Sequence, residues 1–237
     1  MGVYDSLLSA AQLGQEDVIE QLINGGQIDV NVANDEGYTP LILAAKNGHT
    51  GIVKKLLSAQ QIDVNVANNE GDTALMLAAR LKMGDVVKEL LKLTEEQIDV
   101  NVKNGGANAL MMAAELGNQG IANQLVKWSK SNGRIGVNEA NDDGYTALML
   151  AAKNGHDTTV GRLLKDTQID VNFAKNDGYT ALMLAAKDGH KDVVEQLLTV
   201  DQIDVNLVAD DGNNALELAE KNGHNDIVNI IWDKSIG

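Results

Sequence analysis

The chain has 237 residues, of which 44 % are hydrophobic and only 3 % aromatic, and its formal net charge is −15. This hydrophobic content can form a core and excludes a disordered chain, while the absence of cysteine excludes disulfides and thiolate metal sites. The negative charge disfavours nucleic acids and anionic membranes as partners, and apolar runs such as Ala181 to Ala186 are too short to span a bilayer. We therefore expect a protein that binds neither nucleic acid nor a membrane.

One pattern recurs along the chain at intervals of 34, 34, 35, 38, 34 and 34 residues. Its marker is the threonine of Gly-Tyr-Thr-Ala-Leu-Met-Leu-Ala-Ala, or the residue that replaces this threonine. The marker positions are Asp5, Thr39, Thr73, Asn108, Thr146, Thr180 and Asn214. A fixed period of this length predicts a stack of small units, because one unit alone cannot bury its apolar face.

Each unit is expected to begin with a tight turn, which leads into a short buried helix. A glycine for a left-handed backbone stands two residues before the marker, after a run rich in Asn and Asp. These glycines are Gly37, Gly71, Gly106, Gly144, Gly178 and Gly212. The marker threonine can cap the helix with its hydroxyl group, and Pro40 suits the first helical position.

A second glycine is expected to end this helix, and a second, amphipathic helix follows it. These glycines are Gly48, Gly117, Gly155, Gly189 and Gly223. Lys82 takes the same place in the third unit, where a left-handed backbone costs a non-glycine residue roughly 1 kcal/mol. The second helix contains runs such as Ile52 to Leu57 and Val193 to Leu198. The unit closes with Ile-Asp-Val-Asn, which we expect to be extended.

The order Gly-x-Thr-(Ala/Pro)-Leu-x-Leu-Ala-Ala-x-x-Gly-His, followed by Leu-Leu and Asp-Val-Asn, resembles the ankyrin repeat. The resemblance covers residues of about 5 to 232. It implies an all-α fold, an ankyrin-repeat solenoid of stacked helix-turn-helix units with β-turn or hairpin connectors. We expect a single domain, 1–237, with capping repeats at 1–33 and 209–237. The internal repeats are expected at 34–67, 68–102, 103–140, 141–174 and 175–208.

The sequence departs from the family pattern in its period and at its ends. The family period is about 33 residues, and the family's usual histidine in Thr-Pro-Leu-His is replaced here by apolar residues such as Ile42 and Met149. In the last unit Glu217 replaces this apolar residue and Glu220 replaces an alanine, while Ser9 replaces a leucine in the first unit. Polar residues at these positions are typical of capping repeats, and they favour a complete array over a piece of a longer protein.

No pattern in the chain predicts catalysis or a bound cofactor. The histidines all occupy one slot of the repeat, so we expect them to hold turns and not to converge on a metal. They are His49, His156, His190 and His224. Acidic pairs such as Asp142 and Asp143 fall on turn tips, where carboxylates stay solvated, and the calcium-loop pattern lacks its terminal glutamate. We therefore expect no enzymatic activity, no cofactor and no metal.

An asparagine recurs in the Val-Asn step of the connectors, and we expect it to satisfy backbone groups in its turn. The positions are Asn31, Asn65, Asn101, Asn138, Asn172 and Asn206. The resemblance adds that the equivalent asparagine of animal ankyrin repeats can be a substrate of an asparaginyl hydroxylase.

The resemblance also implies a protein-binding surface on the concave face, formed by the turn tips and the first helices. Acidic residues occupy most of these tips and cations the helix ends, and tyrosine, a favoured contact residue, stands between them in several units. The candidate partner-binding residues are Asp35, Tyr38, Lys46, Asp72, Arg80, Asp142, Asp143, Tyr145, Lys153, Asn154, Asp177, Tyr179, Lys187 and Asp188. The alternative is a solvated face on which lysine and acid neutralise each other.

The fourth unit breaks this pattern, because its tip, Asn104 to Ala107, has neither a charge nor an aromatic ring. The connector that follows, Lys127 to Gly136, is longer than the others and contains Trp128, Lys130 and Arg134. Two interpretations are open, a second docking site or loop drift, and the low cost of insertions in surface loops favours drift.

The sequence and the resemblance together predict a monomeric, non-catalytic scaffold for protein–protein interaction. We expect a cytoplasmic location, with the nucleus or a host cytosol as alternatives. The alternative function is an effector or regulatory subunit that inhibits one specific enzyme by covering its site.

Overall fold

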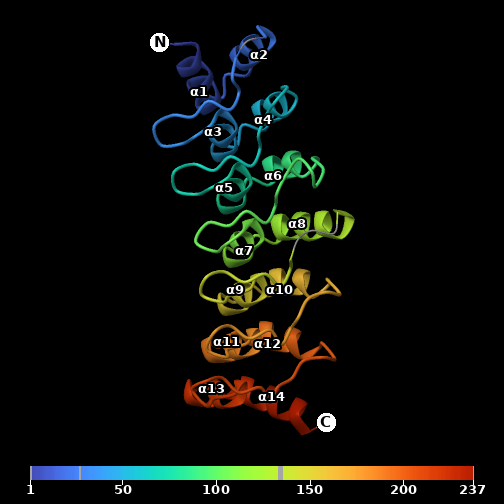
Figure 1. Cartoon of the computed structure of the whole chain (residues 1–237). Coiled ribbons are helices and arrows are strands. Elements are labelled where there is room, and N and C mark those ends of the chain that lie inside the picture. The colour runs from blue at the N-terminus through green and yellow to red at the C-terminus, as the bar shows by residue number, and fades with distance from the viewer. Residues whose placement is uncertain (1, 27, 133–135, 237) are drawn as a thin grey trace. The chain divides into compact units, whose positions relative to one another are not determined.

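The structure, a computed structural model, describes residues 2–26, 28–132 and 136–236. Within these ranges it is helical, and the only β-structure consists of the isolated bridges Ala67 to Thr73 and Ala140 to Thr146. The helices are α1 (Val3–Leu13), α2 (Glu16–Asn24), α3 (Pro40–Lys46), α4 (Thr50–Leu57), α5 (Ala74–Arg80), α6 (Gly84–Leu90), α7 (Ala109–Glu115), α8 (Gln119–Asn132), α9 (Ala147–Lys153), α10 (Asp157–Leu163), α11 (Ala181–Asp188), α12 (Lys191–Leu198), α13 (Ala215–Lys221) and α14 (Asn225–Ile236) (Figure 1). The prediction of an all-α fold is confirmed.

The chain forms two compact units. Unit 1 contains Met1–Asn104 and Lys127–Ile135, and unit 2 contains Gly105–Val126 and Gly136–Gly237. In unit 1 the helices α1, α3 and α5 pack in one row, and α2, α4 and α6 pack in a second row beside it (Figure 1). In unit 2 the first row is α7, α9, α11 and α13, and the second row includes α10, α12 and α14. Each unit is therefore a stack of helix-turn-helix repeats.

The first helix of each repeat begins where the sequence predicts, because the marker residue caps it. The Thr39 hydroxyl accepts the backbone N–H of Ile42 at 3.3 Å, and the hydroxyls of Thr73, Thr146 and Thr180 do the same in their repeats. Pro40 is the first helical residue of α3. Asp5 is an exception, because α1 begins at Val3 and the Asp5 carboxylate accepts the N–H of Gly2 at 2.9 Å from inside the first turn.

The first helices form the centre of each core. In α9 the residues Leu148 to Ala152 are all at most 7 % exposed, and the same stretch is buried in α3, α5, α7 and α11. The second helices contribute one apolar face, which in α12 includes Val193 and Leu197. Burying such a leucine contributes roughly 1.5–3 kcal/mol, and the alanine pairs let neighbouring helices approach closely. The core therefore consists mainly of aliphatic side chains.

The turns follow the predicted backbone. The glycines expected at the tips and between the helices all adopt a positive φ. At Gly106 the requirement is also steric, since a Cβ atom there would lie 2.2 Å from the backbone nitrogen of Asp142. Lys82 has φ 63°, so it occupies the left-handed turn that glycine occupies elsewhere, at a cost of roughly 1 kcal/mol.

The Val-Asn half of each connector lies in a turn, whereas the Ile-Asp half does not, so the prediction that all of Ile-Asp-Val-Asn is extended is wrong for its second half. The physical reason is a local hydrogen bond, in which the aspartate accepts the N–H of the asparagine two residues later, as Asp63 does for Asn65 at 2.9 Å. The asparagine side chain then reaches the next connector. Asn31 donates to the carbonyl of Gln61 at 2.7 Å and accepts the N–H of Asp63 at 2.8 Å.

Three further asparagines make the same pair of hydrogen bonds. They are Asn65 to Gln97 and Asp99, Asn138 to Gln168 and Asp170, and Asn172 to Gln202 and Asp204. These side chains satisfy backbone groups, as predicted, but the groups belong to the following repeat.

The segment predicted as a long connector after the fourth repeat is mostly helix. The helix α8 continues to Asn132, and Trp128 is only 7 % exposed on it. The Trp128 indole N–H donates to the carbonyl of Leu93 at 3.2 Å. Trp128 therefore packs inside unit 1 and is not an exposed docking residue. Arg134, which shared that interpretation, lies outside the described residues.

The residues expected to cap the last repeat have two different roles. The Glu217 carboxylate accepts the backbone N–H of Asn214 at 2.9 Å, so it completes a capping box at the start of α13. Glu220 is exposed on the same helix. None of the helices in the described ranges combines the length and the apolar character that crossing a membrane would require.

Candidate functional site

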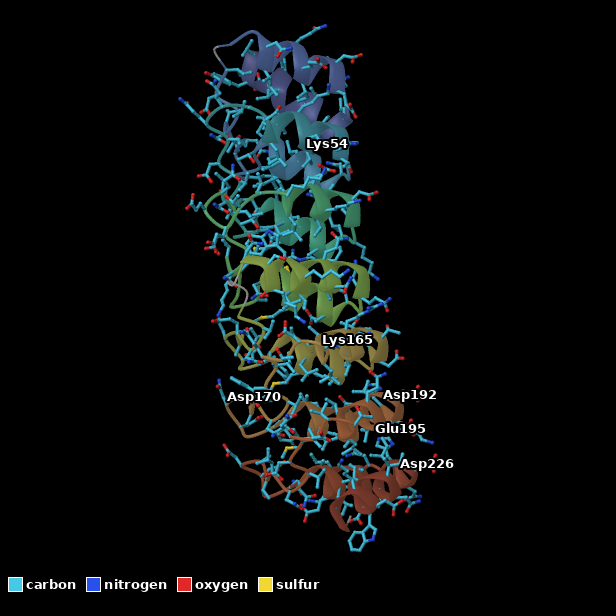
Figure 2. The ribbon with its side chains drawn as sticks, turned by 90° about the vertical axis from the view of Figure 1, so that its right-hand side faces the viewer. Lys54, Lys165, Asp170, Asp192, Glu195 and Asp226 are labelled. Carbon is cyan, nitrogen blue, oxygen red and sulfur yellow. The ribbon has the colours of Figure 1, made fainter. Side chains whose placement is uncertain are left out.

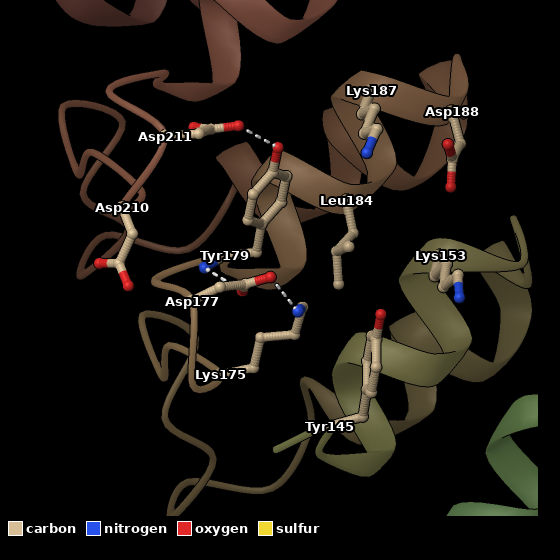
Figure 3. Close-up of a pocket in the computed structure, with 10 residues that line it drawn as sticks. All are labelled: Tyr145, Lys153, Lys175, Asp177, Tyr179, Leu184, Lys187, Asp188, Asp210 and Asp211. Carbon is tan, nitrogen blue, oxygen red and sulfur yellow. Dashed lines mark hydrogen bonds and ion pairs between the residues drawn. The ribbon is translucent and has the colours of Figure 1, made fainter. Parts of the chain in front are cut away.

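A groove with a volume of about 590 Å³ lies in unit 2, at the tips and first helices of its repeats (Figure 3). We call it the tyrosine groove. It is lined by Tyr145, Lys153, Lys175, Asp177, Tyr179, Leu184, Lys187, Asp188, Asp210 and Asp211. Its floor is apolar where Tyr145, Tyr179 and Leu184 meet, and its remaining residues are all charged.

In two neighbouring repeats, the same two positions place a tyrosine and a lysine together in this groove. The tyrosine directly precedes the capping threonine, and the lysine stands eight residues later in the last turn of the first helix. The short first helix therefore brings the Lys153 ammonium to 5.0 Å from the centre of the Tyr145 ring. Lys187 lies 5.2 Å from the Tyr179 ring in the same way. Both distances are within the range of cation–π attraction.

Lys175 joins the two tyrosines. Its ammonium group lies 5.1 Å from the centre of the Tyr145 ring and 5.6 Å from that of Tyr179, and it forms an ion pair with Asp177. Although it is charged, its side chain is only 13 % exposed. The groove thus contains a continuous stack in which three lysines alternate with two tyrosines across neighbouring repeats.

Lys175 occupies a position that is asparagine in three other repeats, whereas Lys103 and Ala209 occupy it in the fourth and the last. Asn141, five residues before its threonine, accepts the N–H groups of Asp143 at 3.1 Å and of Tyr145 at 2.8 Å, and so closes the tip turn. Asn34 and Asn68 do the same in unit 1. Lysine cannot accept a hydrogen bond, so in the Lys175 tip the Asp177 carboxylate accepts the Tyr179 N–H at 3.3 Å.

The acidic residues at the groove are tied to its aromatic and basic residues. The Tyr179 hydroxyl donates to the Asp211 carboxylate at 2.7 Å, and this bond, together with burial, raises the pKa of Tyr179 to about 12. The same bond holds the pKa of Asp211 below its usual value. Burial acts to raise the pKa of Asp177, but the bond from Lys175 and the Tyr179 N–H hold it below the usual range.

Six of the residues selected from the sequence line the tyrosine groove. They are Tyr145, Lys153, Asp177, Tyr179, Lys187 and Asp188. Asp142, Asp143 and Asn154 belong to the same repeats and are exposed, but they do not line it. The Asn154 amide donates to the carbonyl of Leu150 at 2.8 Å, which leaves it beside the end of α9.

The selected residues of unit 1 are arranged differently. Asp35 is exposed at its tip. Tyr38 is 7 % exposed, with the Lys46 ammonium 4.4 Å from its ring and 3.2 Å from its hydroxyl oxygen. Asp72 is fully buried, where it forms two hydrogen bonds of 2.7 Å with Arg80 and accepts the amide of Asn104 at 2.9 Å. Asp72 therefore has no surface to offer a partner.

Four further residues line the groove but are not among the candidates from the sequence: Lys175, Leu184, Asp210 and Asp211. For Lys175 a signal exists, because it breaks the rule that asparagine stands five residues before the threonine in several repeats. The other three give no such signal, since leucine at the position of Leu184 and acids at the tips recur elsewhere in the chain.

A second charged region lies on the outer helices of unit 2, where Asp192 and Glu195 of α12 and Asp226 of α14 project from the surface (Figure 2). The Lys191 ammonium is 3.9 Å from both Glu195 and Asp226. Such exposed pairs contribute little to stability, typically about 0.2–1 kcal/mol. A hollow of about 350 Å³ lies beside Lys191 and Asp226, and it is smaller than the tyrosine groove.

The histidines have the structural role that the sequence predicts. The Nε2 atom of His190 lies 2.8 Å from the carbonyl oxygen of Lys153, so it links the turn of one repeat to the first helix of the preceding repeat. His49, His156 and His224 make the equivalent contact. Among the residues that the structure describes, no group of three or more histidines and carboxylates is placed to hold a metal ion.

The family model for ankyrin repeats, in three copies, matches residues 7–104, 93–174 and 161–236. The chain belongs to the ankyrin-repeat family. No curated protein sequence matches it. Ankyrin repeats are generally modules of protein–protein interaction and typically lack catalytic activity, and the ankyrin-repeat solenoid predicted from the sequence is the fold of this chain.

Solved ankyrin-repeat structures resemble the chain over most of its length. The ankyrin repeat domain of Bcl-3, a member of the IkappaB protein family, is 23 % identical with a TM-score of 0.81, covering 94 % of this chain and 97 % of that one. The human ASB11 ankyrin repeat domain is 23 % identical with a TM-score of 0.75, covering 95 % and 96 %. At these identities the likeness concerns the fold alone.

A third structure is more similar in sequence. It is the complex of the predatory endopeptidase Bd0816 from Bdellovibrio bacteriovorus with the immunity protein Bd3460. The matched chain of that complex is 30 % identical with a TM-score of 0.66, and the match covers 82 % of this ankyrin-repeat chain and 97 % of that one.

Proposed function

We propose that this ankyrin-repeat protein is a non-catalytic scaffold that binds a partner protein in the tyrosine groove of unit 2. The observation that carries the proposal is the stack of Lys153, Tyr145, Lys175, Tyr179 and Lys187, which spans two repeats and lines a groove of about 590 Å³. The partner is a protein and not a nucleic acid, because the chain has a net charge of −15 and aspartates line the groove.

The stack prepares the groove for contact. Tyrosine offers a large area and a polar end with few rotatable bonds, so it loses little entropy on binding. Here both rings are already held in place, Tyr179 by Asp211 and each of them by two lysines. Binding is tighter when the side chains do not have to be ordered at the moment of association.

Affinity capture from the native cell, followed by mass spectrometry, tests the proposal. The wild type is compared with Tyr145→Ala, which removes a half-buried ring from the groove, and with Tyr38→Ala as the matched control in unit 1. We expect at least one protein to be captured by the wild type and the control and lost with Tyr145→Ala. Circular dichroism checks that both variants remain folded. Capture that is identical for all three proteins contradicts the proposed groove.

A second candidate function is inhibition of one specific enzyme by covering its site. It is favoured by the 30 % identity to a chain from the complex of an endopeptidase with its immunity protein. This function uses the same groove but requires one dominant partner with enzymatic activity. Titration of the captured partner should then abolish its activity at a stoichiometry of about one to one, whereas undiminished activity in the complex leaves only the scaffold.

A further inference from the structure

The two sides of the tyrosine groove carry opposite charges. Asp177, Asp210 and Asp211 come from the tip loops and form one side, which we call the tip bank. Lys153 and Lys187 come from the ends of α9 and α11 and form the other side, the helix bank (Figure 3). The floor of tyrosine rings and Leu184 lies between the two banks.

The charges of the two banks remain available to a partner. In the described part of the chain no ion pair joins a lysine of the helix bank to an aspartate of the tip bank. Asp177 is already neutralised by Lys175, but Asp210 is exposed on one bank, and Lys153 and Lys187 are exposed on the other. Asp188 lies beside the two lysines and reduces the positive charge of their bank without cancelling it.

From this arrangement we infer that the tyrosine groove binds an extended peptide segment in which basic and acidic side chains alternate. The inference rests on the proposed function and adds the chemistry of the partner. In an extended segment successive side chains project to opposite sides, so alternating charges place every basic residue on one side and every acidic residue on the other. Such a segment meets the tip bank with its basic side chains and the helix bank with its acidic ones.

The floor suits the backbone of the same segment. The Tyr145 hydroxyl has no hydrogen-bond partner among the residues that the structure describes, so it is free to donate to a peptide carbonyl. The ring faces and Leu184 exclude water from beneath the segment, which strengthens the charge pairs at both banks.

Segments of other charge patterns fit less well. A uniformly basic segment sets its charges against Lys153 and Lys187, and a uniformly acidic one sets them against Asp210 and Asp211. In a helix, residues on one face are three or four positions apart, so alternating charges are spread around the axis and do not separate onto the two banks. The two banks therefore favour a particular order of charged residues along the peptide and not only a particular net charge.

Fluorescence anisotropy at low ionic strength tests the inference with three labelled octapeptides. One alternates lysine and glutamate, the second has the same composition as a block of four lysines followed by four glutamates, and the third contains lysine only. We expect the alternating peptide to bind about tenfold more tightly than the block peptide, a difference in keeping with a few charge pairs at partly buried sites. Equal affinities, or tighter binding of the block or lysine-only peptide, overturn the inference.

Charge reversal at the banks gives a sharper test. Asp210→Lys and Lys187→Glu are each expected to weaken binding of the alternating peptide about tenfold. The double variant exchanges the signs at the two positions, and an alternating peptide can match it by shifting one residue, so binding should recover to within about threefold of the wild type.

Asp192→Lys is the matched control, because it makes the same charge change on an exposed residue of unit 2 outside the groove. It is expected to leave binding within about twofold of the wild type. A double variant that binds more weakly than either single variant contradicts the inference. If the cellular partner is still lost with Tyr145→Ala while the peptides show no preference, the proposed function stands and only the charge order is wrong.

Discussion

The same two positions of the ankyrin repeat are used differently in the two units. In unit 1 they pair Tyr38 with Lys46 and Asp72 with Arg80, and Asp72 also accepts the amide of Asn104 from the next repeat. Tyr38 and Asp72 are buried, and so is Tyr179 in unit 2. In unit 2 the pairs of Tyr145 and Tyr179 are linked across repeats by Lys175 and open onto a groove. The same two repeat positions thus form side-chain pairs in unit 1 and line a candidate binding groove in unit 2.

One residue that contributes to this difference is Lys175. Lys175 replaces the asparagine that closes the tip turn in other repeats, so its repeat loses a local hydrogen-bond acceptor. Natural proteins commonly break a local rule where function requires it. The following changes test how far the two units differ.

The largest expected effect is a loss of stability when a buried leucine of the first helices is truncated, because both units have such a core. Leu148→Ala in unit 2 removes a side chain that is 2 % exposed and should lower the free energy of unfolding by about 2–5 kcal/mol. Leu41→Ala, at the same position of unit 1, should have an effect of similar size because Leu41 is 1 % exposed. Chemical denaturation measures both. A loss below about 1 kcal/mol for either variant means that its helix is not part of a core.

The next largest effect is a difference in stability between variants of the two side-chain pairs of unit 1. Asp72→Ala removes the carboxylate that Arg80 and Asn104 both bind and should cost about 2 kcal/mol, less than the loss of a fully buried pair because the Arg80 side chain is 40 % exposed. Tyr38→Phe removes only the bond to Lys46 and should cost less than about 1 kcal/mol. Equal losses in thermal or chemical unfolding contradict the view that Asp72 is a structural residue.

A smaller effect of opposite sign is expected in the second row of unit 2. Thr159 is fully buried, and its hydroxyl has no hydrogen-bond partner among the residues that the structure describes, whereas the same position in α4 is Ile52. Thr159→Val should stabilise the protein by about 1 kcal/mol, because it removes an unsatisfied buried hydroxyl and keeps the shape. Val193→Thr in α12 is the reverse change and should destabilise by a similar amount. No gain from Thr159→Val indicates that the hydroxyl is satisfied in solution.

The smallest expected effect is a shift in the pH at which the Tyr179 hydroxyl ionises. The bond to Asp211 raises the pKa of Tyr179 to about 12 from an ordinary value of 10.0, so its stabilising contribution is complete below about pH 10 and is lost as the pH rises towards 12. Tyrosinate absorbance should therefore include a transition near pH 12. Asp211→Asn should move that transition to lower pH, while Asp210→Asn should leave it in place. A late transition that persists in Asp211→Asn assigns it to another tyrosine.

Much of the fold follows from rules that act within one repeat. A threonine before an apolar run caps a helix, and a glycine at a tip adopts a positive φ, so these elements could be placed from the sequence alone. Lys82 illustrates the strength of such rules, because it keeps φ 63° although it is not glycine. The connectors were the local failure, since an aspartate two residues before an asparagine makes a turn and not an extended segment.

The parts that could not be predicted depend on contacts between repeats. Asp72 reads as another acid near a tip, but its burial also depends on Asn104, which belongs to the next repeat. Lys175 lies between the Tyr145 ring of one repeat and the Tyr179 ring of the next. The residue spacing inside one repeat does not predict a contact between two repeats. Trp128 reads as part of a loop because the longer sequence there does not reveal that α8 simply continues.

The asparagine of the connector gives the stack a direction. The Asn31 amide donates a hydrogen bond to Gln61 and accepts one from Asp63, and we call this pair of bonds a joint. Asn65, Asn138 and Asn172 make the same joint to the Gln-Ile-Asp of the next connector. Because the joint is the same in these four copies, a repeat that contains it can be duplicated or deleted without the need for a matching change in a neighbour that also contains it. The length of such an array can therefore change faster than the chemistry that holds it together.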